Sequence, residues 1–299
     1  MHDTVGFIGL GLMGRPMAAN LLKAGFPVIA HSRSQPPVDA LVELGATRAG
    51  SPREVAARAT RIITMLPDSG DVELVLEGAD GVFNALQRGT ILVDTSSIAP
   101  AVARRLAARA ADLGATMLDA PVSGGEIGAI NGSLSIMVGG DAAAFGAVKP
   151  ILDAMGNPER VIRIGDAGAG QVCKLCNQMV LGGTIAAVGE AFALARKAGV
   201  DPALVRQALL GGFAQSRVLE VHGERMLTGN YKPGFRTELF AKDLRNVSAA
   251  LADTGVPAPV SATVRALVDR LVAQGRGQND YAELGRLIAE LAGAASPPS

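Results

Sequence analysis

Short apolar runs recur through the first half of the chain, and most are followed by a segment in which apolar residues return every three or four positions. The runs are typical of buried strands, and the spacing between them is typical of amphipathic helices. Strands that alternate with helices predict a parallel sheet with right-handed crossovers. We expect strands at residues 4–9, 26–31, 61–66, 90–94, 116–119, 133–139 and 160–164.

From residue 166 onward only helical spacing remains. The first helix is predicted to be long, residues 168–199, and its centre is nearly all apolar or small, as in a helix buried within a helical domain. Further helices are expected at residues 203–210, 216–227, 239–251, 257–273 and 281–291, and a disordered tail at residues 292–299. The pattern predicts an α/β domain over residues 1–165 and an all-α domain over residues 166–299 that begins with a long interdomain helix.

Composition and charge narrow the class of protein. The 299 residues are 48% hydrophobic and 19% charged, with a formal net charge of +0 and no basic block that would predict a nucleic-acid surface. No apolar run reaches the roughly 20 residues of a membrane-spanning helix, and no secretion signal is recognisable at the N-terminus. We therefore expect a cytoplasmic protein without a nucleic-acid or membrane partner.

The two cysteines, Cys173 and Cys176, form a CxxC pattern. Such a pair could be redox-active or half of a zinc site, but the chain has no second cysteine pair and its histidines lie far away in sequence. We interpret both cysteines as small apolar residues of a packed helix and predict no metal site.

A glycine-rich turn joins the first predicted strand to the first predicted helix. It consists of Gly9, Leu10, Gly11, Leu12, Met13 and Gly14. In this context the first glycine permits the turn, the second lets the backbone approach a pyrophosphate, and the third allows close helix packing. The N–H groups at the helix start favour phosphate. The motif predicts a Rossmann-type dinucleotide-binding domain that binds NADP or NAD.

The end of the second predicted strand bears on the choice of cofactor. An NAD-binding domain usually has Asp or Glu here, which binds the ribose 2′-hydroxyl, but this chain has Ser32 and Arg33. A guanidinium and a hydroxyl suit a 2′-phosphate, so we predict that NADP is preferred. An Arg33 that stacks on the adenine and ignores the phosphate is the alternative.

Ligands of a doubly wound sheet gather at the carboxyl ends of its strands. Four residues of this chain fall at such ends: Leu66, Pro67, Ser96 and Ser123. Ser123 is followed by Gly124 and Gly125, and together they offer a hydroxyl and bare N–H groups that suit a carboxylate or phosphate. An ordinary glycine turn is the alternative.

Lys174 is the one charged side chain in the first turns of the long helix. Lys is rarely buried without a partner and readily changes its protonation when it is. On a helix it shares a face with Asn177 and Gln178, three and four residues further on. The alternative is a helix end whose polar residues lie in solvent. Likewise, Lys242 could reach the active site or could pair with Asp243 on a solvated face.

From end to end the chain resembles the β-hydroxyacid dehydrogenase family. The segments that carry the resemblance are VGFIGLGLMGRPMAANLLKAG, DAPVSGGEIGAINGSLSIMVGGD, GAGQVCKLCNQ and FRTELFAKDL. The glutamate of SGGE, the Asn-Gln of KLCNQ, GGFAQSRVLE and YKPGFR look most like the bacterial branch that reduces tartronate semialdehyde (2-hydroxy-3-oxopropionate) to glycerate.

The resemblance implies roles for individual residues. Lys174 corresponds to the family's catalytic lysine, Ser123 to Gly125 to the substrate carboxylate site, and Ser96 and Lys242 to cofactor contacts. The expected reaction is hydride transfer from the nicotinamide to a small semialdehyde while Lys174 donates the proton, with Asn177 and Gln178 positioning lysine and substrate. A homodimer or homotetramer is also implied.

Two departures from the family pattern stand out. Many relatives have Asn where this chain has Gln178, so the substrate contact is expected to differ slightly, and NADH-using relatives often have Asp in place of Ser32. Related activities on 3-hydroxyisobutyrate, threonate or sulfolactaldehyde remain open. Two more distant alternatives are an imine reductase and a non-catalytic NADP sensor. Imine reductases usually lack the lysine, and a sensor would not need Lys174 or Ser123, so the presence of both residues argues against these alternatives.

Overall fold

The computed structural model describes residues 3–294 of the chain. It separates into two compact units, Met1–Lys174 and Leu175–Ser299. This division lies later than the predicted one at residues 165/166, because the first turn of the long helix is hydrogen-bonded to the sheet of the first unit. The expected disordered tail does not begin at residue 292, because Ala292 and Gly293 form a turn and Ala294 is buried and donates its N–H to the oxygen of Ala289. The remainder of that tail, residues 295–299, lies outside the described residues.

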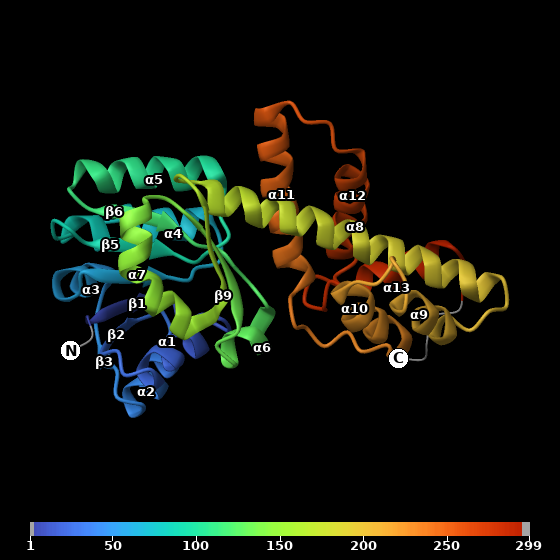
Figure 1. The fold of residues 1–299 in the computed structure, drawn as a ribbon, viewed down its shortest axis with the longest axis horizontal. Coiled ribbons are helices and arrows are strands. Elements are labelled where there is room, and N and C mark those ends of the chain that lie inside the picture. The colour runs from blue at the N-terminus through green and yellow to red at the C-terminus, as the bar shows by residue number, and fades with distance from the viewer. Residues whose placement is uncertain (1–2, 295–299) are drawn as a thin grey trace. The chain divides into compact units, whose positions relative to one another are not determined.

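The first unit is built on one nine-stranded sheet (Figure 1). Its order is β3-β2-β1-β4-β5-β6-β8-β7, with β9 beside β8. The strands from β3 to β6 are parallel, which is the Rossmann arrangement that the sequence predicts. The strands are β1 (Val5–Ile8), β2 (Val28–His31), β3 (Thr47–Arg48), β4 (Arg61–Thr64), β5 (Ile91–Asp94), β6 (Thr116–Asp119), β7 (Val122–Ser123), β8 (Leu134–Gly139) and β9 (Gly156–Gly165).

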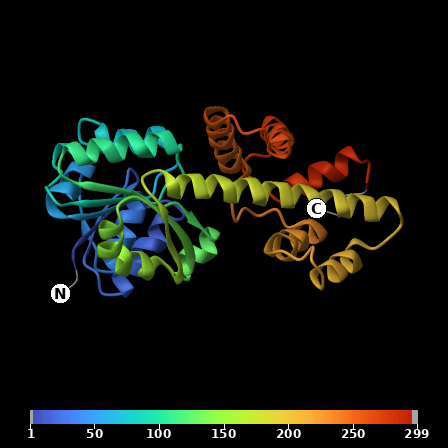
Figure 2. The ribbon, with the colours of Figure 1, turned by 45° about the horizontal axis from the view of Figure 1, so that its top comes forward.

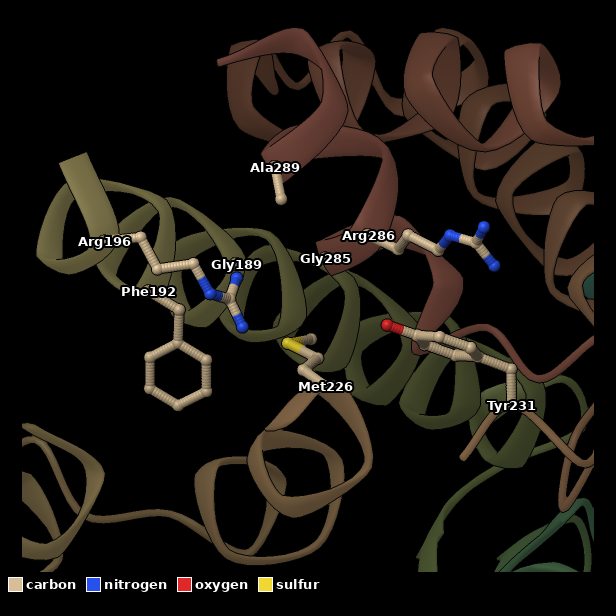
Figure 3. Close-up of a pocket in the computed structure, with 8 residues that line it drawn as sticks. All are labelled: Gly189, Phe192, Arg196, Met226, Tyr231, Gly285, Arg286 and Ala289. Atoms are coloured by element: carbon tan, nitrogen blue, oxygen red, sulfur yellow. The ribbon is translucent and has the colours of Figure 1, made fainter. Parts of the chain in front are cut away.

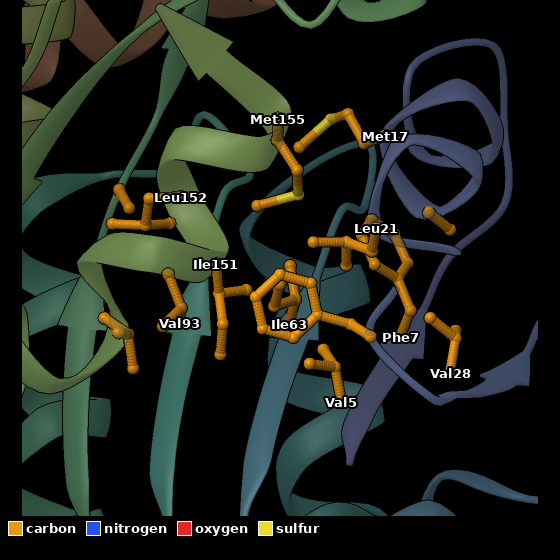
Figure 4. Packing of buried hydrophobic residues seen from close by; sticks show 14 of the residues in the cluster. Val5, Phe7, Met17, Leu21, Val28, Ile63, Val93, Ile151, Leu152 and Met155 are labelled. Atoms are coloured by element: carbon orange, nitrogen blue, oxygen red, sulfur yellow. The ribbon is translucent and has the colours of Figure 1, made fainter. Parts of the chain in front are cut away.

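Helices cover both faces of this sheet. One face carries α1 (Gly14–Lys23), α2 (Gln35–Glu43), α6 (Gly125–Ile130) and α7 (Ala142–Met155), and the other carries α3 (Pro52–Arg58), α4 (Ser69–Glu77), η1 (Val82–Asn84) and α5 (Pro100–Asp112). Successive strand residues point to opposite faces, so Phe7 packs with Met17 and Leu21 of α1 (Figure 4), whereas Ile8 belongs to the cluster on the other face. Strands buried on both sides explain the nearly continuous apolar runs.

The far edge of the sheet differs from the expected all-parallel pattern. β8 is antiparallel to β6 and β7, and β9 is parallel to β8. The six residues of α6 and a turn are too short for a crossover between parallel strands, so the chain reverses into β8. The fourteen-residue α7 is long enough to connect β8 and β9 in parallel.

The second unit consists of helices. A single uninterrupted helix, α8 (Ala169–Lys197), begins in the first unit and supplies much of the core of the second (Figure 2). The others are α9 (Pro202–Leu210), α10 (Arg217–Thr228), α11 (Thr237–Thr254), α12 (Pro259–Ala273) and α13 (Glu283–Leu291). The helices of the second unit agree with the sequence-based expectations to within a few residues, while β3, η1, β7 and α6 of the first unit were not predicted.

By length and composition, α8 could cross a membrane, since an 18-residue window has a mean hydropathy of 1.4. The helix contains no unbroken apolar run of that length, because small and polar residues interrupt it. The core helix of a soluble protein passes the same test, and 44% of this window is buried. The α8 residues in the core of the second unit are Leu175, Ile185, Ala186, Val188, Phe192 and Ala193.

Candidate functional site

The glycine turn after β1 is closely packed on one side and open on the other. Gly9 has a φ of +98°, and a Cβ on it would lie 2.2 Å from the backbone oxygen of Met65. A Cβ on Gly14 would lie 1.9 Å from the oxygen of Gly9, whereas one on Gly11 would meet nothing within 4 Å. No side chain caps the first turn of α1. The turn therefore combines two obligatory glycines with the open approach that a pyrophosphate requires.

The residues predicted to select the cofactor lie next to this turn. The N–H of Leu10 donates to the hydroxyl of Ser32 over 3.4 Å, which ties the turn to the end of β2. The side chain of Arg33 is 82% exposed and lies 3.8 Å from the carboxylate of Asp71 in α4. An exposed ion pair at this distance is weak, so the guanidinium is available to a phosphate.

Ser96 lies at the carboxyl end of β5, and it organises the neighbouring strand end. Its hydroxyl accepts the N–H of Leu66, at 2.9 Å, and donates to Asp94. Asp94 also accepts the hydroxyl of Thr64 over 2.8 Å. Because Ser96 is fully buried, its side chain acts by fixing the segment of Leu66 and Pro67.

Asp94 is a fully buried carboxyl group. Burial raises its pKa to about 6, while the hydrogen bonds from Ser96 and Thr64 act in the opposite direction and Asp119 adds to the increase. The proton on Asp94 is therefore held more tightly in the folded chain than in the unfolded one.

A second buried carboxylate holds the start of α8. Asp119, at the end of β6, accepts the N–H of Gly168 at 2.7 Å and that of Gln171 at 2.8 Å. Burial raises the pKa of Asp119, and these backbone N–H groups oppose the change. Asp119 thus caps α8 from another element, since Asp166 and the residues just before the helix do not provide these bonds.

The Ser123 turn has the unusual backbone that its sequence predicts. Ser123 ends β7 and is partly exposed, and Gly124 and Gly125 have φ values of +136° and +63°. Successive residues in the left-handed region favour glycine, which leaves backbone N–H groups unobstructed by side chains. Asn20 of α1 donates to the oxygen of Ala129 over 2.7 Å, so α6 is tied to the helix that follows the glycine turn.

Lys174 lies in the second turn of α8 and is only 7% exposed. The interpretation of this helix end as a solvated surface is therefore wrong. One turn earlier, a Cβ on Gly170 would lie 2.3 Å from the oxygen of Met137 and 2.6 Å from that of Asp119. Residues 170 and 174 share a helix face, so Lys174 follows on the face that packs against the strand ends of the first unit.

The other polar residues of α8 form a chain within the second unit. Asn177 donates to Gln178 over 2.8 Å, Gln178 donates to Asp243 of α11, and Lys242 pairs with Asp243 at 2.9 Å. Lys242 and Asp243 are 8% and 2% exposed, so the alternative of a solvated Lys242 face is wrong. The predicted residues thus divide between the units, with Asn177, Gln178 and Lys242 in the second and the others in the first.

The two cysteines and the cavity beside Tyr231 add no second candidate site. Cys173 is partly exposed and Cys176 exposed, neither forms a disulfide, and residues 3–294 contain no group of three potential metal ligands. A cavity in the second unit (Figure 3) has room for about one water molecule, too little for an oxoacid. It is lined by Gly189, Phe192, Arg196, Met226, Tyr231, Gly285, Arg286 and Ala289.

Sequence reasoning missed four polar residues that hold the candidate site: Asp94, Asp119, Gln171 and Asp243. Asp94 and Asp119 each close a short apolar strand, and a carboxylate there is a recognisable signal. Gln171 and Asp243 are buried without such a signal, because ordinary helix sequence surrounds them.

Comparisons with known protein families match both parts of the chain. Residues 4–168 match the NAD-binding domain of 6-phosphogluconate dehydrogenase. Residues 168–288 match the family described as NAD-binding of NADP-dependent 3-hydroxyisobutyrate dehydrogenase. The two matches meet at the turn before α8.

Individual relatives match over nearly their full length. The chain is 46% identical to 2-hydroxy-3-oxopropionate reductase of Escherichia coli (strain K12), over 94% of this chain and 95% of the relative. It is 36% identical to the NAD-dependent L-serine dehydrogenase of Pseudomonas aeruginosa, over 95% and 97%. The solved structure of Mycobacterium tuberculosis 3-hydroxyisobutyrate dehydrogenase with L-serine superposes with a TM-score of 0.88 at 33% identity, over 97% and 99%.

Proposed function

We infer the reaction of this chain from its family: it belongs to the β-hydroxyacid dehydrogenases and is an NAD(P)-dependent oxidoreductase. We propose that it reduces 2-hydroxy-3-oxopropionate to glycerate. The observation that carries the proposal is the buried Lys174, in the same compact unit as the glycine turn and the Ser123 turn. The 46% identity to a 2-hydroxy-3-oxopropionate reductase supports this choice of substrate.

The proposed roles follow from the chemistry of each group. A bound nicotinamide supplies a hydride to the aldehyde carbon. The ammonium of Lys174 donates a proton to the carbonyl oxygen, so the aldehyde becomes a primary alcohol, and in reverse the neutral amine accepts that proton. Ser123, Gly124 and Gly125 hold the substrate carboxylate through a hydroxyl and backbone N–H groups.

Asn177 and Gln178 are proposed to orient Lys174 and the substrate. They follow Lys174 by three and four residues on one helix, and the bonds of Gln178 to Asn177 and Asp243 fix its amide. A Gln178 amide that is held in place next to the lysine limits the orientations that the reacting groups explore.

The cofactor groups are proposed to act at separate parts of the dinucleotide. The glycine turn, Gly9 to Gly14, binds the pyrophosphate, and Ser32 and Arg33 bind the adenosine ribose with its 2′-phosphate. Leu66 and Pro67, held by Ser96, border the cofactor. Lys242 is proposed as a further cofactor contact. NADP is therefore proposed as the preferred cofactor.

A second candidate substrate class comes from the relatives. One is an L-serine dehydrogenase, and a solved structure contains L-serine with a 3-hydroxyisobutyrate dehydrogenase. All these compounds pair a carboxylate with a hydroxyl or carbonyl on the β-carbon, which the same lysine and serine turn could serve. Threonate and sulfolactaldehyde stay open as well. A cytoplasmic location and a homodimer or homotetramer remain predictions.

A parallel assay tests substrate and cofactor together. Consumption of NADPH and of NADH is followed with 2-hydroxy-3-oxopropionate, methylmalonate semialdehyde, succinic semialdehyde and sulfolactaldehyde, and the reverse reaction with 3-hydroxyisobutyrate, threonate and L-serine. The highest kcat/KM is expected for 2-hydroxy-3-oxopropionate with NADPH. A higher kcat/KM for another acid would replace the proposed substrate, and tight NADPH binding without turnover would favour an imine reductase or a sensor.

A further inference from the structure

Gln171 is a fully buried residue to which the catalytic proposal assigns no role. Its side-chain oxygen accepts the N–H of Ile98 over 3.1 Å, and its side-chain N–H donates to the oxygen of Ser96 over 2.8 Å. Its own backbone N–H donates to Asp119. One residue of α8 is thereby fixed to the segment after β5 and to the end of β6.

The positions of these bonds matter for the proposed reaction. The segment that Gln171 holds begins at Ser96, whose hydroxyl fixes Leu66 beside the proposed cofactor site. On α8, Lys174 is three residues beyond Gln171, which is less than one turn and on the same side of the helix. A shift of Gln171 relative to Ser96 would therefore move the proton donor and a cofactor-binding segment relative to each other.

The glycines around this junction show that the fit is close. A Cβ on Gly139 would lie 2.5 Å from the carboxylate of Asp119 and 2.8 Å from the N–H of Ala169. With Gly170 equally tight, the first turn of α8 has no room to slide along the sheet. The side chain of Gln171 also fixes the start of α8 relative to the segment that follows β5.

We propose that Gln171 is a positioning residue that sets Lys174 in register with the cofactor segment at Ser96. The proposal rests on the proposed role of Lys174 as proton donor. Gln171 touches neither reacting atom, and it acts through the two backbone groups that it binds. Both of those groups would be left buried and unpaired by an apolar side chain of the same length.

The test compares Q171M and Q171E with Q87M. Q171M keeps the length of the side chain and removes both of its hydrogen bonds. The control Gln87 likewise makes two side-chain hydrogen bonds to the backbone, to the oxygens of Ala56 and Ala57, but it is exposed and lies before β5, at the opposite end of that strand from Ser96. For each variant we would measure the thermal midpoint, kcat, and the NADPH dissociation constant from cofactor fluorescence.

Q171M is expected to lower kcat by roughly 10–100-fold, because small displacements of reacting groups are costly, and to weaken NADPH binding. Q87M is expected to lower the thermal midpoint while leaving kcat and NADPH binding at wild-type values. A Q171M variant that loses thermal stability but keeps both kinetic values would show that Gln171 is only structural, and would overturn the proposal.

Q171E supplies a readout that a purely structural role would not move. A protonated glutamic acid can donate to Ser96 and accept from Ile98, as Gln does, whereas the carboxylate would face the Ser96 oxygen without a proton. The ratio of Q171E to wild-type kcat is therefore expected to rise as the pH falls from about 8 to about 5.5. Asp94, Asp119 and Lys174 are the charged groups near this position, and division by the wild-type value at each pH leaves the pH dependence that the substitution itself introduces.

The same ratio for Q171M should stay flat with pH. A flat ratio for Q171E would overturn the proposal. If Q171M does not fold, the pH dependence of Q171E relative to wild type tests the proposal by itself. Failure of the proposed function is recognised separately, by wild-type turnover in a Lys174→Ala variant. The NADPH dissociation constants of Q171M and Q87M remain informative in that case, because they need no substrate.

Discussion

Lys174 carries the only ammonium that the proposed mechanism uses as an acid, and it is almost completely buried. Lys174→Ala should reduce turnover by roughly 10²–10⁴-fold, the usual contribution of a positioned general acid, while NADPH still binds. Lys174→Met controls for lost packing, since it keeps most of the side-chain length. Steady-state kinetics and NADPH titration would check this, and turnover close to wild type in either variant would exclude Lys174 as the proton donor.

Arg33 permits a prediction about cofactor choice. Arg33→Asp should lower the ratio of kcat/KM for NADPH to that for NADH by roughly 10–100-fold, because a charge-assisted bond to phosphate is replaced by repulsion. Asp71→Asn is the matched variant, since it frees Arg33 from its ion pair and should leave the ratio equal or higher. An unchanged ratio in Arg33→Asp would mean that Arg33 does not bind the 2′-phosphate.

The raised pKa of Asp94 predicts that the free energy of unfolding depends on pH. Its folded pKa, about 6, is above its usual value of 3.8, so its contribution is fully present below about pH 3.8 and is lost as the pH rises through about 6. The difference of about 2 pKa units corresponds to at most about 3 kcal/mol. Asp94→Asn cannot ionise and still accepts the Ser96 and Thr64 hydroxyls.

Urea unfolding at about pH 5 and pH 7 tests this expectation. The wild-type protein should lose more stability between these two values than Asp94→Asn does, and the variant should be the more stable of the two near pH 7. Equal losses in both proteins would show that Asp94 is not the group that titrates. Asp119 is present in both proteins, so its own burial contributes to both, and only its interaction with Asp94 differs between them.

At the scale of the element, glycine-to-alanine substitutions at two positions of α8 are expected to have opposite effects on stability. Gly170→Ala places a methyl group against two backbone oxygens that cannot move aside, and should cost about 1–3 kcal/mol of unfolding free energy. Gly183→Ala on the same helix meets only Val260, at an ordinary 3.5 Å, and should stabilise the helix by up to about 1 kcal/mol. Denaturant unfolding of both variants would check this, and equal destabilisation would contradict the close approach at Gly170.

Some of the helices and strands could be predicted from the sequence and others could not. The glycine turn and the parallel strands could be predicted because strand and helix periodicity is local and the motif requires a strand on one side and a helix on the other. The reversal at β8 could not, since it depends on the short length of α6, which has no clear pattern. The contacts of Asp119 with Gly168 and Gln171 join residues about fifty positions apart, and no local signal encodes such pairs.

For the candidate site, residue types were predictable where the chemistry is distinctive. Lys174 stands out as a charge in apolar surroundings, and Ser123 as a hydroxyl before two glycines. The sequence leaves the burial of Lys242 open, because a Lys-Asp pair on a helix has the same sequence pattern in solvent and in a core. Tertiary packing decides that question, with Asp243 bound by Gln178 from another helix.

At the scale of the whole molecule, the apolar cores of the two units share no residue within the described range 3–294. NADPH at about 100 times its dissociation constant should stabilise the unit that binds it by about 2.7 kcal/mol. Hydrogen exchange followed by mass spectrometry should then slow in core peptides of the first unit, such as β1 and β5, by a larger factor than in α11. Equal slowing in both units would show that they unfold together.

The continuity of α8 has a consequence for recombining related enzymes. A crossover between genes in the turn at residues 165–168 would pair one parent's Asp119 with the other parent's Gln171 and Lys174. A crossover just after Lys174 would keep those groups together but would interrupt a helix whose remaining turns form the core of the second unit. Exchange of the nucleotide-binding half therefore requires the two parents to share a compatible helix sequence through this junction, so these two units are poor modules for shuffling even though each has its own core.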